Sequence, residues 1–241
     1  MLKAIVFDVD DTLYDQKPSF DAAFKQVFSN NFDNNLIAKI FSNYVRQERL
    51  VVAKNNLDNQ LQLSKADISF HCLHHSFKAF SSESLTRQKA AEFWRLYSEL
   101  SQRIQLFDGL ATVFNRLFEK FKLGIITNGK TETQLSKITR LNLHHWFSRE
   151  NIITSEEVNA QKPDPMIFTL MNRKFKLRGS EMMYVGSSYL NDIVPAKKAG
   201  WQAVWYNNHD SSIVDPTIIP DQTVNNSLQL QELLLELAAE V

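Results

Sequence analysis

Residues 4–12 read AIVFDVDDT, and this segment decides the fold. A short apolar run with β-branched residues at Ile5 and Val6 is followed abruptly by three acids, Asp8, Asp10 and Asp11. Such a run is typical of a buried strand, and the acids cannot continue it into the core. We therefore predict a buried strand over residues 4–7 that ends in an acidic loop.

The stretch that follows, residues 16–105, carries apolar side chains at the spacing of amphipathic helices. The four stripes are Phe20, Ala23, Phe24, Val27 and Phe28; Ile37, Ile40, Phe41, Tyr44 and Val45; Phe70, Leu73, Phe77 and Phe80; and Phe93, Leu96, Tyr97 and Leu100. Glycine is absent between Thr12 and Asp108, whereas all six glycines of the chain lie beyond Asp108. We predict a four-helix bundle without strands over residues 16–105.

From residue 106 onward, short apolar runs alternate with helical patterns. Strands are expected at 123–126, 151–154, 182–185 and 203–206, and helices at 110–121, 131–141, from 166 onward, up to 200 and at 227–239. This alternation predicts a parallel sheet with helices on both faces. The fold class is therefore α/β, with a doubly wound, Rossmann-like core (residues 1–15 and 106–241) and an inserted α-helical bundle (residues 16–105).

In sheets of this kind, ligands bind beyond the carboxyl ends of the strands. Polar residues that follow the predicted strands should therefore lie together: Asp8, Asp10, Thr127, Asn128, Lys162, Ser187 and Asp192. Adjacent carboxylates such as Asp8 and Asp10 repel each other unless a cation lies between them. Mg²⁺ prefers oxygen ligands and readily retains a substrate phosphate oxygen. One carboxylate can attack phosphorus, and a second can serve as general acid and base.

Each of the other residues suits the same chemistry. Thr127 and the main-chain amides beside Asn128 can donate to phosphate oxygens. Lys162 can neutralise the phosphate and the attacking carboxylate, and Asp192 can support a metal. Taken singly, these residues fit blander interpretations better: a solvated acidic turn, an ordinary strand end, a surface lysine and a helix cap. Their combined order along the chain is what favours a phosphotransfer site.

With these motifs in view, the chain resembles the haloacid dehalogenase superfamily, in the subclass that has a helical cap after the first motif. The matching segments are Asp8–Leu13, Ile125–Gly129, Lys162–Pro165 and Gly186–Gly200. The resemblance extends over nearly the whole chain, including the position of the cap. Residues 125–129 and 152–162 are most similar to the pyrimidine 5'-nucleotidase-like branch.

The resemblance implies an Mg²⁺-dependent phosphatase that acts on a small phosphorylated metabolite, with nucleoside monophosphates as one candidate class. Asp8 would be the nucleophile and Asp10 the acid and base. Thr127, Asn128 and Lys162 would hold the phosphate. Asp8, the main-chain carbonyl of Asp10 and an acid of the final motif would bind Mg²⁺.

The final motif departs from the pattern of the superfamily at Ser187. This motif usually begins Gly-Asp, whereas here Ser187 follows Gly186 and replaces the acid that would ligate Mg²⁺. Asp192 remains, so Ser187 and Asp192 are both candidate metal-site residues. The alternative is a catalytically weakened phosphate-binding or regulatory protein of the same fold.

Two other classes fit the sequence less well. A dehalogenase of the superfamily lacks the second acid, so Asp10 argues against it. A signalling receiver domain also arranges acids, a Thr and a Lys on a parallel sheet, but it is about half this length and has no inserted bundle.

The composition of the chain limits which binding partners and which cellular compartment we expect. Lys+Arg and Asp+Glu both number 27, so the net charge is zero and nucleic acid is not expected as a partner. Apolar runs are too short for a membrane span, and the apolar N-terminus is too short for a signal peptide. The single cysteine, Cys72, requires no oxidising compartment. We expect a cytoplasmic protein, either a monomer or a homodimer.

Overall fold

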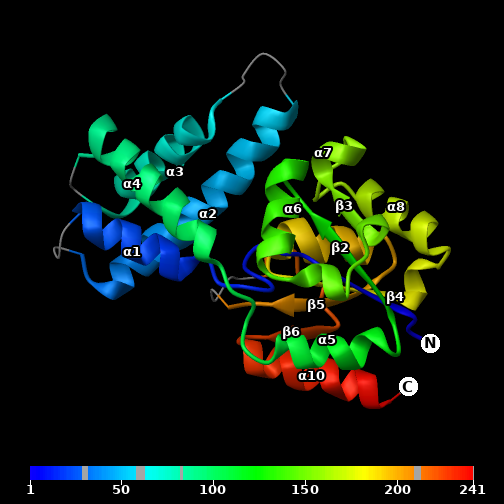
Figure 1. Cartoon of the computed structure of the whole chain (residues 1–241). Helices are drawn as coiled ribbons and strands as arrows, with labels where there is room; N and C mark the ends of the chain where they lie inside the picture. Colours follow the sequence, from blue (N-terminus) through cyan, green and yellow to red (C-terminus); the bar gives the residue numbers. More distant parts are fainter. Residues whose placement is uncertain (29–31, 58–62, 82–83, 209–212, 241) are drawn as a thin grey trace. The chain divides into compact units, whose positions relative to one another are not determined.

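The chain forms two compact units in the computed structural model (Figure 1). The structure describes residues 1–28, 32–57, 63–81, 84–208 and 213–240. The first unit consists of residues 1–15 and 104–241, and the second of residues 16–103. The division after residue 103 lies two residues before the expected one at 105/106.

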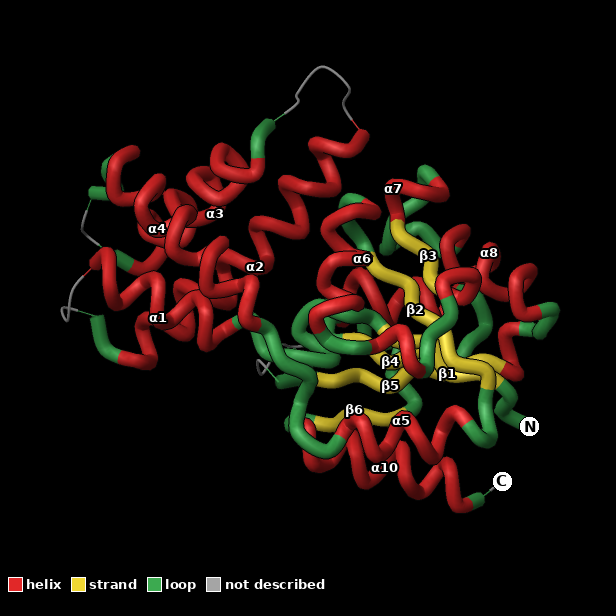
Figure 2. Tube along the Cα trace, viewed as in Figure 1, coloured by secondary structure: helices red, strands yellow, loops and turns green. Residues whose placement is uncertain are grey.

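The first unit is built on a six-stranded parallel sheet of order β3-β2-β1-β4-β5-β6 (Figure 2). Its strands are β1 (Ala4–Phe7), β2 (Lys122–Thr127), β3 (Ile152–Thr154), β4 (Met182–Gly186), β5 (Gln202–Tyr206) and β6 (Gln222–Val224). The central strand is β1, where Phe7 pairs with Ile125 on one side and Val185 on the other. All four residues of β1 are buried, as in a sheet covered on both faces.

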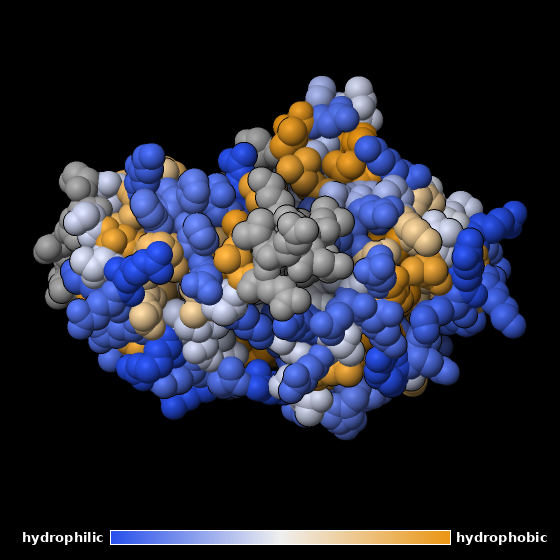
Figure 3. Space-filling view, turned by 90° about the horizontal axis from the view of Figure 1, so that it is seen from above, coloured by the Kyte–Doolittle hydropathy of each residue, from blue (hydrophilic) through white to orange (hydrophobic). Residues whose placement is uncertain are grey.

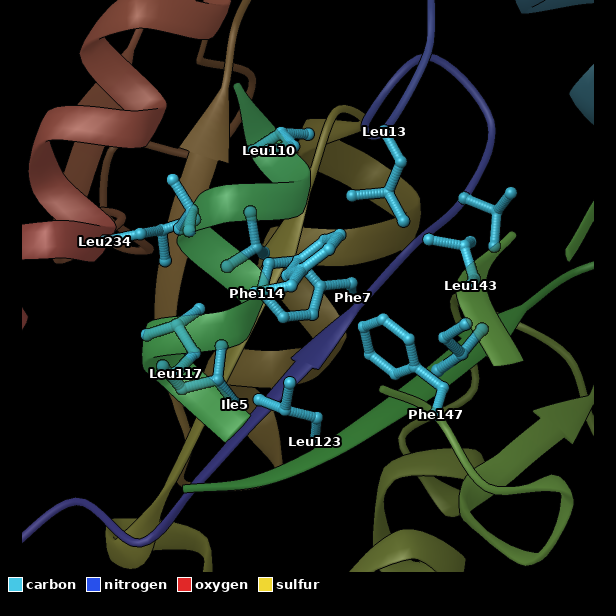
Figure 4. Packing of buried hydrophobic residues seen from close by; sticks show 14 of the residues in the cluster. Ile5, Phe7, Leu13, Leu110, Phe114, Leu117, Leu123, Leu143, Phe147 and Leu234 are labelled. Carbon is cyan, nitrogen blue, oxygen red and sulfur yellow. The ribbon is translucent and has the colours of Figure 1, made fainter. Parts of the chain in front are cut away.

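Helices cover both faces of this sheet because successive side chains of each strand point to opposite faces. Ile5 and Phe7 pack with α5 (Leu110–Phe118), α6 (Thr131–Arg140) and α10 (Ser227–Ala239). Figure 4 shows Phe7 beside Phe114 and Phe147, and the ring centroids are 5.3 and 5.9 Å from that of Phe7.

The opposite face of β1 presents Ala4 and Val6 to a second apolar cluster. This cluster includes residues of α8 (Met166–Phe175) and α9 (Val194–Lys198). A short helix, α7 (Ser155–Val158), follows β3. The doubly wound α/β prediction is therefore confirmed.

The structure corrects several predicted element bounds. The strand β6 was not predicted. It has three residues, of which only Val224 is buried, so it contains no apolar run that would reveal it. The helix expected to reach residue 200 starts instead as a π-helical turn over Tyr189–Ile193 and ends at Lys198. Asn151 belongs to a 3₁₀ turn, so β3 begins one residue later than predicted.

The second unit contains the helices α1 (Lys17–Phe28), α2 (Asn34–Leu57), α3 (Lys65–Phe80) and α4 (Arg87–Leu100). Helix α1 packs against α4, and α2 packs against α3. Phe20 lies at the centre of an aromatic core, with ring centroids 5.1 Å from both Phe41 and Phe93. Large aromatic side chains bury much apolar area, and they hold this unit together.

The surface drawn in Figure 3 is mostly hydrophilic where residues are described, with hydrophobic residues in smaller patches. Within the described residues, each helix is too short or too polar to cross a membrane.

Candidate functional site

The carboxyl end of β1 supplies two of the predicted site residues. The main-chain N–H of Asp8 donates to Val185 O at 2.9 Å and so continues the β1–β4 pairing. The chain then turns tightly, with the Leu13 N–H donating to Val9 O at 3.1 Å. Asp11 adopts a left-handed conformation with φ 55° within this turn. Asp8 and Asp10 therefore both lie at the end of the central strand.

Lys162 connects Asp8 to the final motif. Its Nζ lies 2.9 Å from Asp8 Oδ1, 2.6 Å from Asp192 Oδ1 and 2.9 Å from the Tyr184 hydroxyl oxygen. A lysine ammonium has three N–H donors, so these three acceptors use all of them. The Lys162 side chain is only 3% exposed, and the Asp192 side chain is fully buried. Lys162 is thus a buried cation between two carboxylates.

The pKa values follow from this arrangement. Burial raises the pKa of Asp8 to about 6, although the Lys162 ammonium acts in the opposite direction. Burial alone would lower the pKa of Lys162, but the carboxylates of Asp192 and Asp8 outweigh burial and raise it. Lys162 therefore stays charged, as a buried cation with two close anionic partners should.

Asn128 holds the main chain of Lys162. The Asn128 side-chain amide donates to Lys162 O at 2.8 Å, and its carbonyl oxygen accepts from the Lys162 N–H at 2.9 Å. Thr127 precedes it at the end of β2, in the strand next to β1. The Asn128 side chain therefore positions Lys162. From the sequence, Asn128 was expected to bind phosphate.

Asp192 is held by the π-helical turn that follows β4. Its Oδ2 accepts from the Ser188 N–H at 2.7 Å, so both carboxylate oxygens have protein partners. Gly186 makes this fit possible, because a Cβ at that position would lie 2.5 Å from Asp192 Cβ and 2.7 Å from Asp192 Oδ2. Each carboxylate oxygen can accept a second partner, so these two contacts leave Asp192 able to support a metal.

Asp10 has three side-chain donors that sequence reasoning missed. Lys137 Nζ lies 2.6 Å from Oδ1 and 2.8 Å from Oδ2, and Gln134 Nε2 donates to Oδ2 at 3.2 Å. The Tyr14 hydroxyl donates to Oδ1. Partial burial would raise the pKa of Asp10, but the Lys137 ammonium and these hydrogen bonds together lower it.

A faint signal for the donors on α6 exists in the sequence. Gln134 and Lys137 are three residues apart in the helix that directly follows the Thr127-Asn128-Gly129 strand end. Residues at this spacing share one helix face. Their helix begins close to the carboxyl end of β2, where ligands bind in such sheets. Gln134 and Lys137 were therefore candidates for the site.

Thr127 carries an unused donor. Its side chain is fully buried, and its hydroxyl has no hydrogen-bond partner among the described residues. A buried polar group without a partner is unfavourable, so its presence points to a ligand that completes it. A phosphate oxygen accepts hydrogen bonds and would be a suitable partner for the Thr127 hydroxyl.

The residues expected to bind Mg²⁺ offer both anionic and neutral oxygen atoms. The available donors are the Asp8 carboxylate, the main-chain carbonyl of Asp10 and the Ser187 hydroxyl, which donates to that carbonyl at 3.3 Å. Oxygen donors of this kind fit Mg²⁺. Within the described residues there is no cluster of three His, Cys, Asp or Glu that could hold a metal. The donor set therefore fits Mg²⁺ in type, with the Asp8 carboxylate as one anionic donor and Asp192 as a second candidate.

Most of the predicted residues lie at or just beyond the carboxyl ends of β1, β2 and β4, whereas Lys162 comes from the segment between α7 and α8. Asp8, Lys162 and Asp192 form one connected group, and Asn128 is attached to it through the Lys162 main chain. Asp10 and Ser187 are joined by the hydrogen bond to the Asp10 carbonyl.

Known proteins resemble this chain over nearly its whole length. A glyceraldehyde 3-phosphate phosphatase of Methanothermobacter thermautotrophicus is 28% identical, and the match covers 97% of this chain and all of that protein. The pyrimidine 5'-nucleotidase YjjG of Escherichia coli is 26% identical over 95% of this chain and 96% of its own.

A solved structure shares the fold. The putative HAD-hydrolase YfnB from Bacillus subtilis, a structure bound to magnesium, superposes with a TM-score of 0.67 and 22% identity, covering 97% of this chain and 98% of that chain. The profile of the haloacid dehalogenase-like hydrolases matches residues 5–206, which include every site residue described above. The chain therefore belongs to the haloacid dehalogenase-like hydrolase family.

Proposed function

We propose that this protein is an Mg²⁺-dependent phosphatase of small phosphomonoesters and that Asp8 is its nucleophile. One observation carries the proposal: the buried Asp8 carboxylate contacts Lys162 at 2.9 Å at the end of the central strand. The unpartnered Thr127 hydroxyl on the neighbouring strand supports it. The relatives named as phosphatases of glyceraldehyde 3-phosphate and of pyrimidine nucleotides make triose phosphates and nucleoside monophosphates the first substrates to test.

In the first step, an Asp8 carboxylate oxygen attacks phosphorus and the bond from phosphorus to the leaving oxygen breaks. Asp10 must be protonated at this step, in spite of the pKa that Lys137 lowers, and it gives this proton to the leaving oxygen. In the second step, Asp10 takes a proton from water as the water oxygen attacks phosphorus. The bond between phosphorus and Asp8 then breaks, which releases phosphate and restores the Asp8 carboxylate.

Other residues hold the phosphate and its charge. Thr127 would donate its free hydroxyl to a phosphate oxygen. Lys162 would act through its charge, because its three N–H groups already have acceptors. Mg²⁺, held by Asp8, the Asp10 carbonyl and Ser187, would supply positive charge to the phosphate oxygens, and Asp192 would contribute through Lys162. In this proposal the inserted helical unit is the cap domain.

Hydrolysis of p-nitrophenyl phosphate, nucleoside monophosphates and triose phosphates, with Mg²⁺ and with EDTA, tests the proposal. We expect turnover that depends on Mg²⁺. Absence of turnover on every phosphomonoester, with phosphate still bound, would instead support the alternative of a weakened phosphate-binding or regulatory protein. Ser187 at the expected acid position is the observation that favours this alternative.

Asp10→Asn is expected to lower kcat/KM for an alkyl phosphate by about a hundredfold or more, because the amide can neither give nor take the proton. The measurement is steady-state hydrolysis, with circular dichroism to show that the fold is retained. The matched control is Asp108→Asn, which changes an exposed carboxylate. A rate for Asp10→Asn within about twofold of wild type would contradict the acid–base role.

Ser187→Asp is expected to tighten Mg²⁺ binding on the order of tenfold, because an anionic oxygen binds this hard cation better than a neutral hydroxyl. Calorimetric titration with Mg²⁺ measures the affinity directly, and the magnesium dependence of turnover gives a second reading. Ser187→Asn is the control, since it has the shape of aspartate without the charge. Unchanged or weaker binding in Ser187→Asp would show that Ser187 does not face the metal.

A further inference from the structure

Asp10 is held by a pair of residues on one helix. Gln134 and Lys137, which we call the α6 clamp, both donate to its carboxylate from a single face of α6. Lys137 lies within 2.8 Å of both oxygens and so spans the carboxylate. These contacts join residues 124 and 127 positions apart in the chain. The side chains of Asp10 and Lys137 are 23% and 20% exposed, so the pair is partly shielded from solvent.

The clamp is itself fixed by its surroundings. Gln134 Nε2 also donates to Asn128 O at 3.0 Å, which ties the clamp to the strand end that carries Thr127. Gly129 leaves room for this amide, because a Cβ there would lie 2.8 Å from Gln134 Nε2. Gly129 also has φ 137°, a conformation that other residues rarely adopt. A side chain at 129 would displace Gln134 from Asp10.

We propose that the α6 clamp positions the Asp10 carboxyl for proton transfer to the leaving-group oxygen, with Lys137 as a positioning residue. The inference depends on the phosphatase function proposed above. Lys137 acts through Asp10. Without Lys137 the carboxyl group keeps only Gln134 and Tyr14 as side-chain donors and is held less firmly. Small errors in the placement of a reacting group lower rates strongly.

This role predicts a dependence on the leaving group. An alkoxide is a poor leaving group and needs the proton from Asp10, whereas p-nitrophenolate departs as a stable anion without it. The parameter kcat/KM includes only the steps up to phosphorylation of Asp8. Loss of the clamp should therefore lower kcat/KM for alkyl phosphates and leave that for p-nitrophenyl phosphate nearly unchanged.

The test compares Lys137→Met with wild type on an alkyl phosphate and on p-nitrophenyl phosphate. We expect kcat/KM to fall about tenfold or more for the alkyl phosphate and by less than about threefold for p-nitrophenyl phosphate. Lys137→Arg should restore much of the loss, because arginine keeps the charge and can span a carboxylate. Lys120→Met, at an exposed lysine, is the matched control and should change neither rate.

Combining the substitutions shows whether Lys137 acts through Asp10. If it does, Lys137→Met should have little further effect in an Asp10→Asn background. Equal losses on both substrates, or a loss in stability with the ratio of rates unchanged, would overturn the inference while the phosphatase function stands. A wild-type protein that hydrolyses neither substrate would overturn both.

Discussion

Asp8→Asn is expected to abolish turnover while leaving the fold intact. Asparagine has the shape of aspartate, and its carbonyl oxygen can still accept a hydrogen bond from Lys162. The amide cannot attack phosphorus, so kcat should fall by about a thousandfold or more, as for the loss of other catalytic nucleophiles. Steady-state hydrolysis with Mg²⁺ measures this loss, and circular dichroism with thermal unfolding checks the fold.

Trapping the intermediate makes the same prediction sharper. Wild-type protein quenched in acid during turnover of a ³²P-labelled substrate should retain label on Asp8, and Asp8→Asn should retain none. Asp108→Asn, at an exposed position, should behave as wild type. Undiminished turnover in Asp8→Asn would exclude the covalent mechanism.

Lys162→Met is expected to have the largest effect on stability. Lys162 is 3% exposed and lies between Asp8 and the fully buried Asp192. Its removal leaves two carboxylates near each other without their cation. Breaking a buried ion pair in this way costs about 3–5 kcal/mol in the free energy of unfolding. Urea denaturation in EDTA, which removes any metal that could compensate, measures this change.

A second substitution isolates the cause. In the Lys162→Met/Asp192→Asn double variant one of the two stranded charges is gone, so part of the lost stability should return. Lys120→Met is the control at an exposed site. A loss below about 1 kcal/mol in Lys162→Met would mean that the ion pairs contribute no more than exposed ones do. Turnover should also be lost, since Lys162 neutralises Asp8 and the phosphate.

The core of the fold could be predicted from the sequence because its signals are local. The apolar run at 4–7 is buried on both faces, and the pattern at 227–239 is a helix with those bounds. The edge strand at 222–224 was missed because pairing with β5, and not its own residues, makes it a strand. A local sequence pattern reveals an element whose own apolar residues are buried. It does not reveal an element that is stable only because it pairs with a neighbouring strand.

The position of the site was also predictable, since parallel strands present their carboxyl ends at one edge. By that rule Asp8 and Thr127 follow or end neighbouring strands and Asp192 follows β4, as the structure has them. The rule could not assign partners to them. The Asn128 side chain turned out to hold the Lys162 main chain, and Tyr184 to accept from Lys162 Nζ.

The sequence by itself therefore determined the order along the chain of the five strands other than β6 and of the main helices, together with the family motifs and the edge of the sheet where they meet. Only the tertiary structure decided that the three N–H donors of Lys162 contact Asp8, Asp192 and Tyr184. It also decided that Lys137 and Gln134 donate to Asp10. Hydrogen bonds and ion pairs depend on distances of about 3 Å between atoms. Residues more than a hundred positions apart reach such distances only when packing fixes the helices against the sheet.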